Sequence, residues 1–235
     1  MVDRIAARVV ALSPNLKFAV AVTAEEREAS FRLRHRAVVE RGWTAPADLE
    51  DGLERDEHDA DALLLVAWDG EVPVGTARFV FPAPGHLLPT EAAFAIRVEP
   101  VGQVVDAGRF VVARSHSRIE HGVLAGLLGF GWLTVRARGY SVLCSAFATD
   151  AAIRMYARMG FTTVVLAPPR ELWGETRSPI RWDIPASTAG LERRWGMGHE
   201  GGARDPIQVE AEAETANTMA SSAAGPSGGP PPSRT

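Results

Sequence analysis

The sequence predicts an α/β fold, in which helices flank a mixed, mostly antiparallel central sheet with a bulged, splayed strand. Strand and helix patterns alternate from residue 17 to about residue 186. Two apolar runs flank Asp69-Gly70, the strongest short hairpin signal, so neighbouring strands run antiparallel. The stretch VVDAGRFVV at 104–112 carries charges inside an apolar strand, which indicates an irregular strand. These features argue against a doubly wound parallel sheet.

Composition divides the chain into three parts. With 235 residues, of which 46% are hydrophobic, the chain has enough apolar material for one medium domain. We assign residues 1–16 to an N-terminal extension and residues 17–186 to the domain. Residues 187–235 are predicted to be a disordered Pro/Gly/Ser-rich tail, because they cannot bury enough apolar surface to offset the entropy of ordering. Within this tail, only the stretch 191–197 could dock.

Charge and cysteine content exclude several function classes. A formal net charge of −4 argues against nucleic acid binding. The single cysteine, Cys144, cannot form an internal disulfide, and nothing indicates an oxidising compartment. No apolar run approaches the roughly 18 residues of a membrane span, and the N-terminal stretch is too broken for a signal peptide. We therefore expect a cytoplasmic protein without a membrane span, a metal site or a tightly bound cofactor.

The elements follow in chain order. Residues 17–22 form a short strand, after which Thr23 and Glu26 have capping-box spacing and predict a helix to about Glu40. Strands are expected at 62–68 and 72–81 on either side of the hairpin turn, and at 104–112. Apolar spacing then predicts a helix at 119–136, a strand at 140–146, a helix at 151–159 and a strand at 162–167.

The strand at 104–112 raises a question of charge. Asp106 and Arg109 are three residues apart, so in a regular strand they would point to opposite faces. Gly108 lies between them, and a strand glycine often marks a bulge, which would bring both side chains to one face and turn a backbone amide toward a carbonyl oxygen. The alternative is an internal salt bridge with no catalytic part. Taken alone, this stretch favours the salt bridge.

Charged and aromatic residues elsewhere have ordinary explanations when taken singly. Asp56 and Asp59 precede a strand and would usually lie in a solvated loop. Trp43 follows the first long helix and would usually be a core aromatic. Arg78, in GTARFVF, would usually be a surface residue on the open face of a sheet.

Taken together, these residues match a family pattern. The matching residues, in order, are Arg34, Trp43, Asp56-x-x-Asp59, Arg78 and acid-x-x-Arg109-Phe110. The order and spacing, over roughly residues 17–184, resemble the acyl-homoserine-lactone (autoinducer) synthases and their relatives, the long-chain N-acyl amino acid synthases. Both belong to the GNAT-like acyltransferase superfamily, so the resemblance implies a GNAT-like fold. One departure is Asp106, which stands where the family has a glutamate.

The second half of the chain resembles the same superfamily. Tyr156, Gly160 and Phe161 match a segment in which a helix ends in Y-x-x-x-G-F. In many GNAT acetyltransferases that tyrosine protonates the departing thiolate, and a phenol is a plausible acid for this step. Packing of Tyr156 beneath the sheet is the alternative.

The resemblance also bears on the acyl donor. The stretch ARSHSRIEHGVLAGLL, where acetyl-CoA-dependent relatives carry a pyrophosphate loop, has only a degenerate version of that loop. This favours an acyl-acyl-carrier-protein donor, with acyl-CoA kept open. A set of arginines could form a basic surface that binds the acidic carrier. In most proteins such arginines simply lie on solvent-exposed helix faces. They are Arg114, Arg118, Arg136, Arg138, Arg154 and Arg158.

The resemblance implies an N-acyltransferase that moves a fatty acyl group to the amine of an amino acid or S-adenosylmethionine. The expected catalytic residues are Asp106 near the base, the bulge amide at Gly108 as oxyanion donor, and Tyr156. The expected substrate-binding residues are Arg34, Trp43, Asp56, Asp59, Arg78, Arg109 and Phe110. Arg109 is expected to pair with Asp59 or Asp106, and Cys144 and Ala146 to line the acyl pocket.

Two other functions remain open at this stage. One is an acetyl-CoA-dependent N-acetyltransferase that acts on a small amine or a protein terminus. The other is a non-catalytic module that senses an acyl ligand. The complete acid-x-x-Arg and D-x-x-D pairs favour the enzyme.

Overall fold

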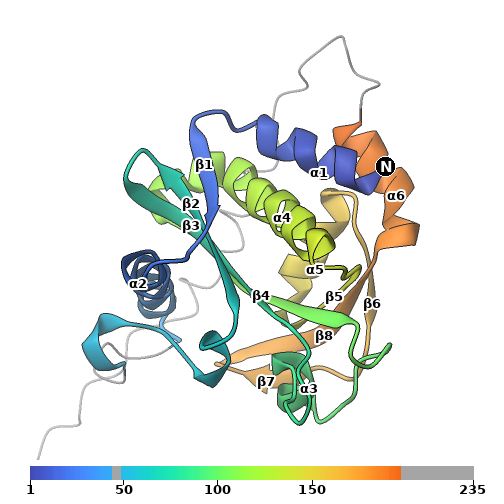
Figure 1. The fold of residues 1–235 in the computed structure, drawn as a ribbon. Helices are drawn as coiled ribbons and strands as arrows, with labels where there is room; N and C mark the ends of the chain where they lie inside the picture. The colour runs from blue at the N-terminus through green and yellow to red at the C-terminus, as the bar shows by residue number, and fades with distance from the viewer. Residues whose placement is uncertain (44–48, 197–235) are drawn as a thin grey trace, which may run out of the picture. The chain divides into compact units, whose positions relative to one another are not determined.

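The computed structural model describes residues 1–43 and 49–196, apart from the side chains of Glu50 and of residues 117–121. A single path of strands runs in the order β1-β2-β3-β4-β5-β8-β6, with β7 paired to β8 (Figure 1). The pairs along this path are antiparallel except β4 and β5, which are parallel. The predicted mixed, mostly antiparallel sheet is confirmed.

The first half of the sheet is a meander that follows the predicted pattern. Its strands are β1 (Leu16–Val20), β2 (Leu63–Asp69), β3 (Val72–Val80) and β4 (Val104–Val112). Asp69 pairs with Val72 across the predicted turn, and Gly70 takes the left-handed conformation with φ of 58°. Glycine has no Cβ and adopts this conformation at little cost, which explains the hairpin signal.

The helix α2 (Ala24–Glu40) begins at the predicted capping box. The backbone N–H of Glu26 donates to Thr23 Oγ1 at 3.2 Å, and the N–H of Thr23 donates to Glu26 Oε2 at 3.0 Å. The helix lies on one face of the sheet, where the hydroxyls of Ser30 and Thr76 are 2.6 Å apart and buried. This contact fixes α2 against β3.

The opposite face of the sheet is covered by α4 (Glu120–Ala137), and α1 (Val2–Ala11) lies along the outside of α4 (Figure 1). The core between α4 and the strands includes Val123, Leu127, Ala77 and Phe79. Two further helices are α3 (Pro89–Phe94) in the β3–β4 connection and α5 (Asp150–Arg158) between β5 (Val142–Ala148) and β6 (Thr162–Val165).

Both domain boundaries differ from the sequence-based ones. Residues 1–16 were expected to be an extension, but α1 buries Ile5 and Val9 in the main core. The tail was expected to begin at residue 187, but α6 (Ile184–Trp195) continues the fold and buries Leu191 at 4% exposure. Both helices carry only a narrow apolar stripe, so their composition alone indicated solvent-exposed segments. Residues 197–235 of the expected tail lie outside the described residues.

The sequence analysis also missed β7 (Arg170–Leu172) and β8 (Glu175–Asp183), although β8 lies between β5 and β6. Charged residues and Pro179 break its apolar pattern, and a proline normally argues against a central strand. Here the β5–β8 register shifts between Ser145 and Ala148, at the position of Pro179. The irregularity accommodates a residue that has no N–H to donate.

Candidate active site

The predicted bulge is present in β4, one residue after Gly108. On β3, Thr76 pairs with Val111 while Arg78 pairs with Gly108, so two residues of β4 oppose Ala77 alone. These two residues are Arg109 and Phe110. Arg109 has φ of 53°, which is uncommon for a residue other than glycine.

The bulge distributes side chains between the two faces. Arg78 and Asp106 share the α2 face, because Arg78 pairs with Gly108 and Val80 pairs with Asp106. The extra residue turns Arg109 to that same face, where its partners Glu54 and Asp56 lie. This is the arrangement that the sequence analysis expected from a bulge. Phe110 instead packs edge to face on Phe79, with ring centroids 6.0 Å apart, on the α4 face.

The predicted splay begins just before the bulge. β4 and β5 are paired only from Val104 to Asp106 and from Val142 to Cys144, and beyond these residues the two strands are not paired. A Cβ added to Gly108 would meet no heavy atom within 4 Å, so there is open space at this position. Gly108 and the bulge therefore lie on the part of β4 that is not paired with β5.

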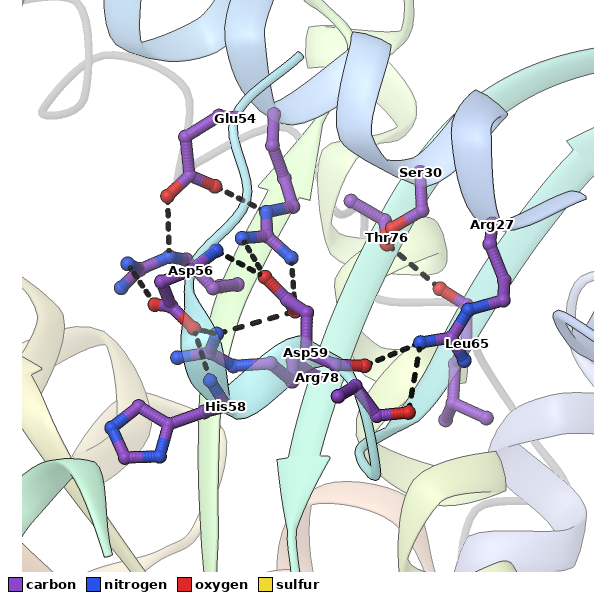
Figure 2. Close-up of polar contacts among 12 residues, drawn as sticks. Arg27, Ser30, Glu54, Asp56, His58, Asp59, Leu65, Thr76 and Arg78 are labelled. Carbon is purple, nitrogen blue, oxygen red and sulfur yellow. Dashed lines mark hydrogen bonds and ion pairs between the residues drawn. The ribbon is translucent and has the colours of Figure 1, made fainter. Parts of the chain in front are cut away.

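Six charged side chains on the α2 face form a closed ring in which arginines and carboxylates alternate (Figure 2). In order around the ring they are Arg34, Glu54, Arg109, Asp56, Arg78 and Asp59. Each of the three arginines contacts two carboxylates, and each carboxylate contacts two arginines. The ring has no net charge.

Two arginines show the geometry of these contacts. Arg34, from α2, donates to both carboxylate oxygens of Asp59 at 2.8 and 2.9 Å and also bonds Glu54. Arg109 donates to Glu54 Oε1 at 3.0 Å and to Asp56 Oδ2 at 2.9 Å. The expectation that Arg109 pairs with Asp59 or Asp106 is therefore wrong, because Glu54 and Asp56 take Arg109 while Asp59 pairs with Arg34 and Arg78.

The loop before β2 places its carboxylates by its own hydrogen bonds. The N–H of His58 donates to Asp56 Oδ1 at 3.0 Å, and the N–H of Asp56 donates to Asp59 Oδ2 at 2.8 Å. Burial alone would raise the pKa of Asp59, but the hydrogen bonds and charge of Arg34 outweigh burial and lower this pKa to about 2. Asp59 therefore remains ionised beside the guanidinium groups of Arg34 and Arg78.

Sequence reasoning missed Glu54, which links Arg34 to Arg109. It lies two residues before Asp56 and is 9% exposed. The only sequence signal for Glu54 was its place in the acidic run ERDEHD, which begins at Glu54. The family pattern in this run includes Asp56 and Asp59 but not Glu54.

Asp106 lies beside the ring but is not a member of it. Its Oδ2 accepts a hydrogen bond from the N–H of Thr90 at 2.7 Å and lies 3.7 Å from Cys144 Sγ. Burial raises the pKa of Asp106, although its hydrogen bonds with Thr90 and the charge of Arg78 act against that rise. Its exposed fraction is 3%.

The remaining expected site residues occupy different places. Trp43 lies near the site, with its ring centroid 6.0 Å from that of Trp173 at the β7–β8 turn. Tyr156 lies in the core against Trp182, with centroids 5.2 Å apart, and burial raises the pKa of Tyr156 to about 12. The structure does not bring Tyr156 into the charged ring.

The two expected acyl-pocket residues are both fully buried. Cys144 packs with Leu88 and Val98 on the α3 side, and burial raises the pKa of its thiol. An apolar cavity lies elsewhere, on the α4 side of the sheet, and Leu143 rather than Cys144 contributes to it from β5. Its lining also includes Leu128, Trp132, Trp182 and Leu191.

The degenerate loop expected for the donor falls partly on residues 117–121, whose side chains lie outside the described part of the chain, and these include Arg118. Arg114 and Arg154 are exposed, while Arg138 packs over Phe81. No helix in residues 1–43 or 49–196 is long and apolar enough to cross a membrane.

The model of the family "N-acyl amino acid synthase FeeM" matches residues 29–171, which is more than half of the chain. The chain belongs to this family. A comparison with curated proteins finds no match. The FeeM-family match includes the whole charged ring and the bulged strand, and the resemblance seen in the sequence is confirmed.

Solved structures agree on the fold. The structure of FeeM, an N-acyl amino acid synthase from uncultured soil microbes, is 17% identical with a TM-score of 0.57, covering 76% of this chain and 96% of FeeM. The CoA-dependent acyl-homoserine lactone synthase BjaI, with SAM and isopentyl-CoA, is 23% identical with a TM-score of 0.59, covering 84% and 98%. TofI, in a complex with an inhibitor and MTA, is 21% identical with a TM-score of 0.60, covering 76% and 96%.

The predicted GNAT-like acyltransferase fold is confirmed by these structures. The chain is an enzyme that transfers acyl groups, as its family membership shows. The sequence-based prediction of an acyltransferase related to N-acyl amino acid and autoinducer synthases is confirmed.

Proposed function

We propose that the protein transfers a fatty acyl group from a pantetheine thioester to the primary amine of an α-amino acid or of S-adenosylmethionine. The observation that carries this proposal is the β4 bulge, which lies where β4 is no longer paired with β5, follows Asp106 on the same strand and contributes Arg109 to the charged ring. A thioester at this unpaired part of β4 would lie beside a carboxylate, a displaced backbone amide and a rigid polar wall.

Asp106 serves as the base in this proposal, directly or through an ordered water. Burial raises the pKa of its carboxyl, which strengthens it as a proton acceptor for an ammonium group. The resulting amine attacks the thioester carbonyl carbon, a C–N bond forms, and negative charge develops on the carbonyl oxygen. The amide near Gly108 stabilises that oxygen.

Collapse of this intermediate breaks the C–S bond and leaves a thiolate that needs a proton. Tyr156 is the proposed donor. Its raised pKa, about 12, keeps the phenol protonated at neutral pH but also makes it a weaker acid than a solvated tyrosine. A Tyr156→Phe variant that keeps full activity would remove Tyr156 from the mechanism.

The charged ring orients the acceptor. Arg34, Asp56, Asp59, Arg78 and Arg109 hold one another by paired contacts, so their positions are fixed before substrate arrives. Trp43 borders this wall. Phe110 contributes from the opposite face, by packing beneath the bulge that supports Arg109.

For the donor, we propose an acyl carrier protein, with acyl-CoA as the alternative. The exposed Arg114 and Arg154 would attract an acidic carrier. The structural likeness to BjaI, a CoA-dependent synthase solved with isopentyl-CoA, supports the alternative. A cytoplasmic location remains a prediction from the sequence.

The acyl chain is proposed to pass β5 at Cys144 and Ala146 and to end in the apolar cavity on the α4 side. Apolar side chains from α1, α4, β5, β8, α6 and the α5–β6 connection line that cavity. Burial of each methylene there would contribute about 0.8 kcal/mol.

The test is release of free thiol from acyl-carrier-protein and acyl-CoA thioesters in the presence of a panel of amines, with products identified by mass spectrometry. Asp106→Asn should abolish release, because the amide cannot accept the proton, yet should leave the circular dichroism spectrum unchanged. Arg36→Gln, a change at an exposed position of α2, is the matched control and should stay active.

The two rival functions give different results in the same assay. Turnover of acetyl-CoA alone, with no longer chain accepted, would support an N-acetyltransferase. Binding of acyl thioesters without turnover in any combination would support a sensor. Full activity of Asp106→Asn would refute the proposed base.

A further inference from the structure

Next to the charged ring, five side chains, one of them a member of that ring, alternate between arginine and tryptophan; we call this set the cation–aromatic ladder. In order they are Arg41, Trp43, Arg177, Trp173 and Arg109. The distances from each guanidinium carbon to the neighbouring ring centroid are, in the same order, 4.9, 4.6, 5.5 and 4.6 Å. Arg109 is shared with the charged ring, so the ladder leads from the active site outward.

Arg41 and Arg177 both lie close to the indole of Trp43. Among the described residues, neither contacts two carboxylates, as each arginine of the charged ring does. Arg177 is 4% exposed, and its pKa is lowered by burial and by the charge of Arg41, although Glu175 opposes the change. Two guanidinium groups this close to Trp43 concentrate positive charge. The charged ring cannot neutralise it, because each of its carboxylates already contacts two arginines.

The carboxylate of Glu175 shows how Arg177 binds an anion. Two of its N–H groups donate to the carbonyl oxygens of Leu172 and Phe147, at 3.2 and 3.3 Å, and hold the guanidinium in place. The third nitrogen, Nη2, donates to Glu175 Oε2 at 2.5 Å. The Glu175 side chain is 40% exposed, so it can move aside and leave Nη2 to another carboxylate.

We propose that Arg177 and Arg41 bind the α-carboxylate of the acceptor, with Glu175 supplying the competing carboxylate in the free protein. This inference rests on the proposed function and assigns to the acceptor site two residues that the family pattern in the sequence did not include. The charge balance of the described residues supports it: Arg41, Arg177 and Glu175 together carry one surplus positive charge, which an α-carboxylate neutralises. Trp43, whose ring both guanidinium groups contact, gives the bound acceptor an apolar surface.

The experiment uses matched acceptors that differ only in the carboxylate: L-tyrosine against tyramine, and S-adenosylmethionine against its decarboxylated form. For Arg177→Gln and Arg41→Gln we expect kcat/KM for the carboxylate-bearing acceptor to fall by about 10- to 100-fold, the usual value of a charge-assisted hydrogen bond. The value for the decarboxylated acceptor should change less than about twofold. Arg36→Gln, at an exposed position of α2, is the matched control and should leave both values unchanged.

A change of opposite sign provides a second test. Glu175→Gln removes the competing carboxylate, so KM for the carboxylate-bearing acceptor should fall by about 2- to 5-fold, as expected for a partly exposed ion pair. An equal loss for both acceptors in Arg177→Gln would mean that Arg177 only supports the fold, and would overturn the inference. The inference would also be overturned if Glu175→Gln left KM unchanged and Arg41→Gln left the preference for the carboxylate-bearing acceptor unchanged.

Failure of the proposed function is distinguishable from failure of this inference. If the wild-type protein releases no thiol with any acceptor, the proposed reaction is wrong, and binding is then measured directly by titration calorimetry with L-tyrosine and S-adenosylmethionine. Binding that disappears in Arg177→Gln and is absent for the decarboxylated forms would still support the carboxylate site. Equal binding by both proteins, or none to either, would overturn it.

Discussion

At the scale of single residues, the closed ring explains why so many charges can be buried. A buried ion needs a partner, and an ion pair with one partner missing is more costly than no pair at all. Glu54 is the member that closes the ring, since it alone joins Arg34 to Arg109. Its loss leaves both arginines with one carboxylate each.

We therefore predict that Glu54→Gln lowers the free energy of unfolding by about 3 kcal/mol, the usual cost of removing one partner from a buried pair. Urea denaturation measures this value. Glu57→Gln is the matched control, because its side chain is 85% exposed in the same loop, and it should change stability by less than about 0.5 kcal/mol. Equal effects of the two substitutions would contradict the importance of the ring.

The ring also predicts a dependence on acid. The pKa of Asp59 is lowered to about 2 in the folded protein, below its unfolded value of about 3.9. A carboxyl with a lowered folded pKa stabilises the fold above the unfolded pKa, and this contribution is lost as pH falls toward 2. Thermal unfolding from pH 6 to pH 2 should show this loss, and Asp59→Asn should unfold at a lower temperature at pH 6 but depend less on pH over this range.

At the scale of elements, the contact between α4 and the sheet depends on small residues. Gly131 of α4 packs directly on Phe79 of β3, and a Cβ built on Gly131 would lie 2.3 Å from Phe79 Cζ. Phe79 is 1% exposed and cannot move toward solvent. The close approach keeps α4 against the strand that carries Arg78 on its other face.

Gly131→Ala tests this contact. Alanine favours a helix by about 1 kcal/mol over glycine, whereas overpacking a core costs about 1–3 kcal/mol. We expect the second effect to be larger, so the variant should unfold at a lower denaturant concentration. The double variant with Phe79→Leu should recover part of the loss, and a stabilised single variant would contradict the packing described for α4.

Elements with a local signal could be predicted from the sequence, and elements that depend on distant partners could not. The capping box at Thr23 and the turn at Gly70 act within four residues, and both are where the sequence places them. The strand β8 contains Pro179 and pairs with β5 through a shift in register between Ser145 and Ala148. No local sequence pattern reveals this shift.

The same distinction holds for the site. Arg34, Asp56, Asp59 and Arg78 were found through their family order and meet in the ring, and the bulge at Arg109 followed from Gly108 in a charged strand. Trp173 and Arg177 were missed because they come from the β7–β8 hairpin. Glu54 was missed because its role depends on two arginines that are distant in sequence.

At the scale of the whole molecule, the helices α1 and α6 contribute side chains to the main core and are not appendages to it. The indole N–H of Trp132 in α4 donates to Asp3 of α1 at 2.6 Å. α6 contributes Leu191 to the same apolar cavity that α1 covers through Ile5 and Val9. The size of this cavity is therefore set by elements that are far apart in the chain.

This arrangement predicts how acyl length is limited. Leu128 of α4 lines the cavity, so Leu128→Trp should fill part of it and shift the preferred acyl chain to a shorter length, with activity toward short chains retained. Product profiles from a mixture of acyl thioesters, measured by mass spectrometry, give the answer. Val72→Trp, at a 60% exposed position of the hairpin, is the control, and an unchanged profile in Leu128→Trp would place the acyl chain elsewhere.

The alternation of sign around the closed ring has an evolutionary consequence. Exchanging Arg34 with Glu54 would preserve their own attraction but would set each of them against a like charge on its other side, at Asp59 and at Arg109. A swap of any two neighbouring members of the ring would therefore create two like-charge contacts. Only a simultaneous reversal of all six signs would keep every attraction, so the pattern should persist in descendants long after the surrounding loops have diverged.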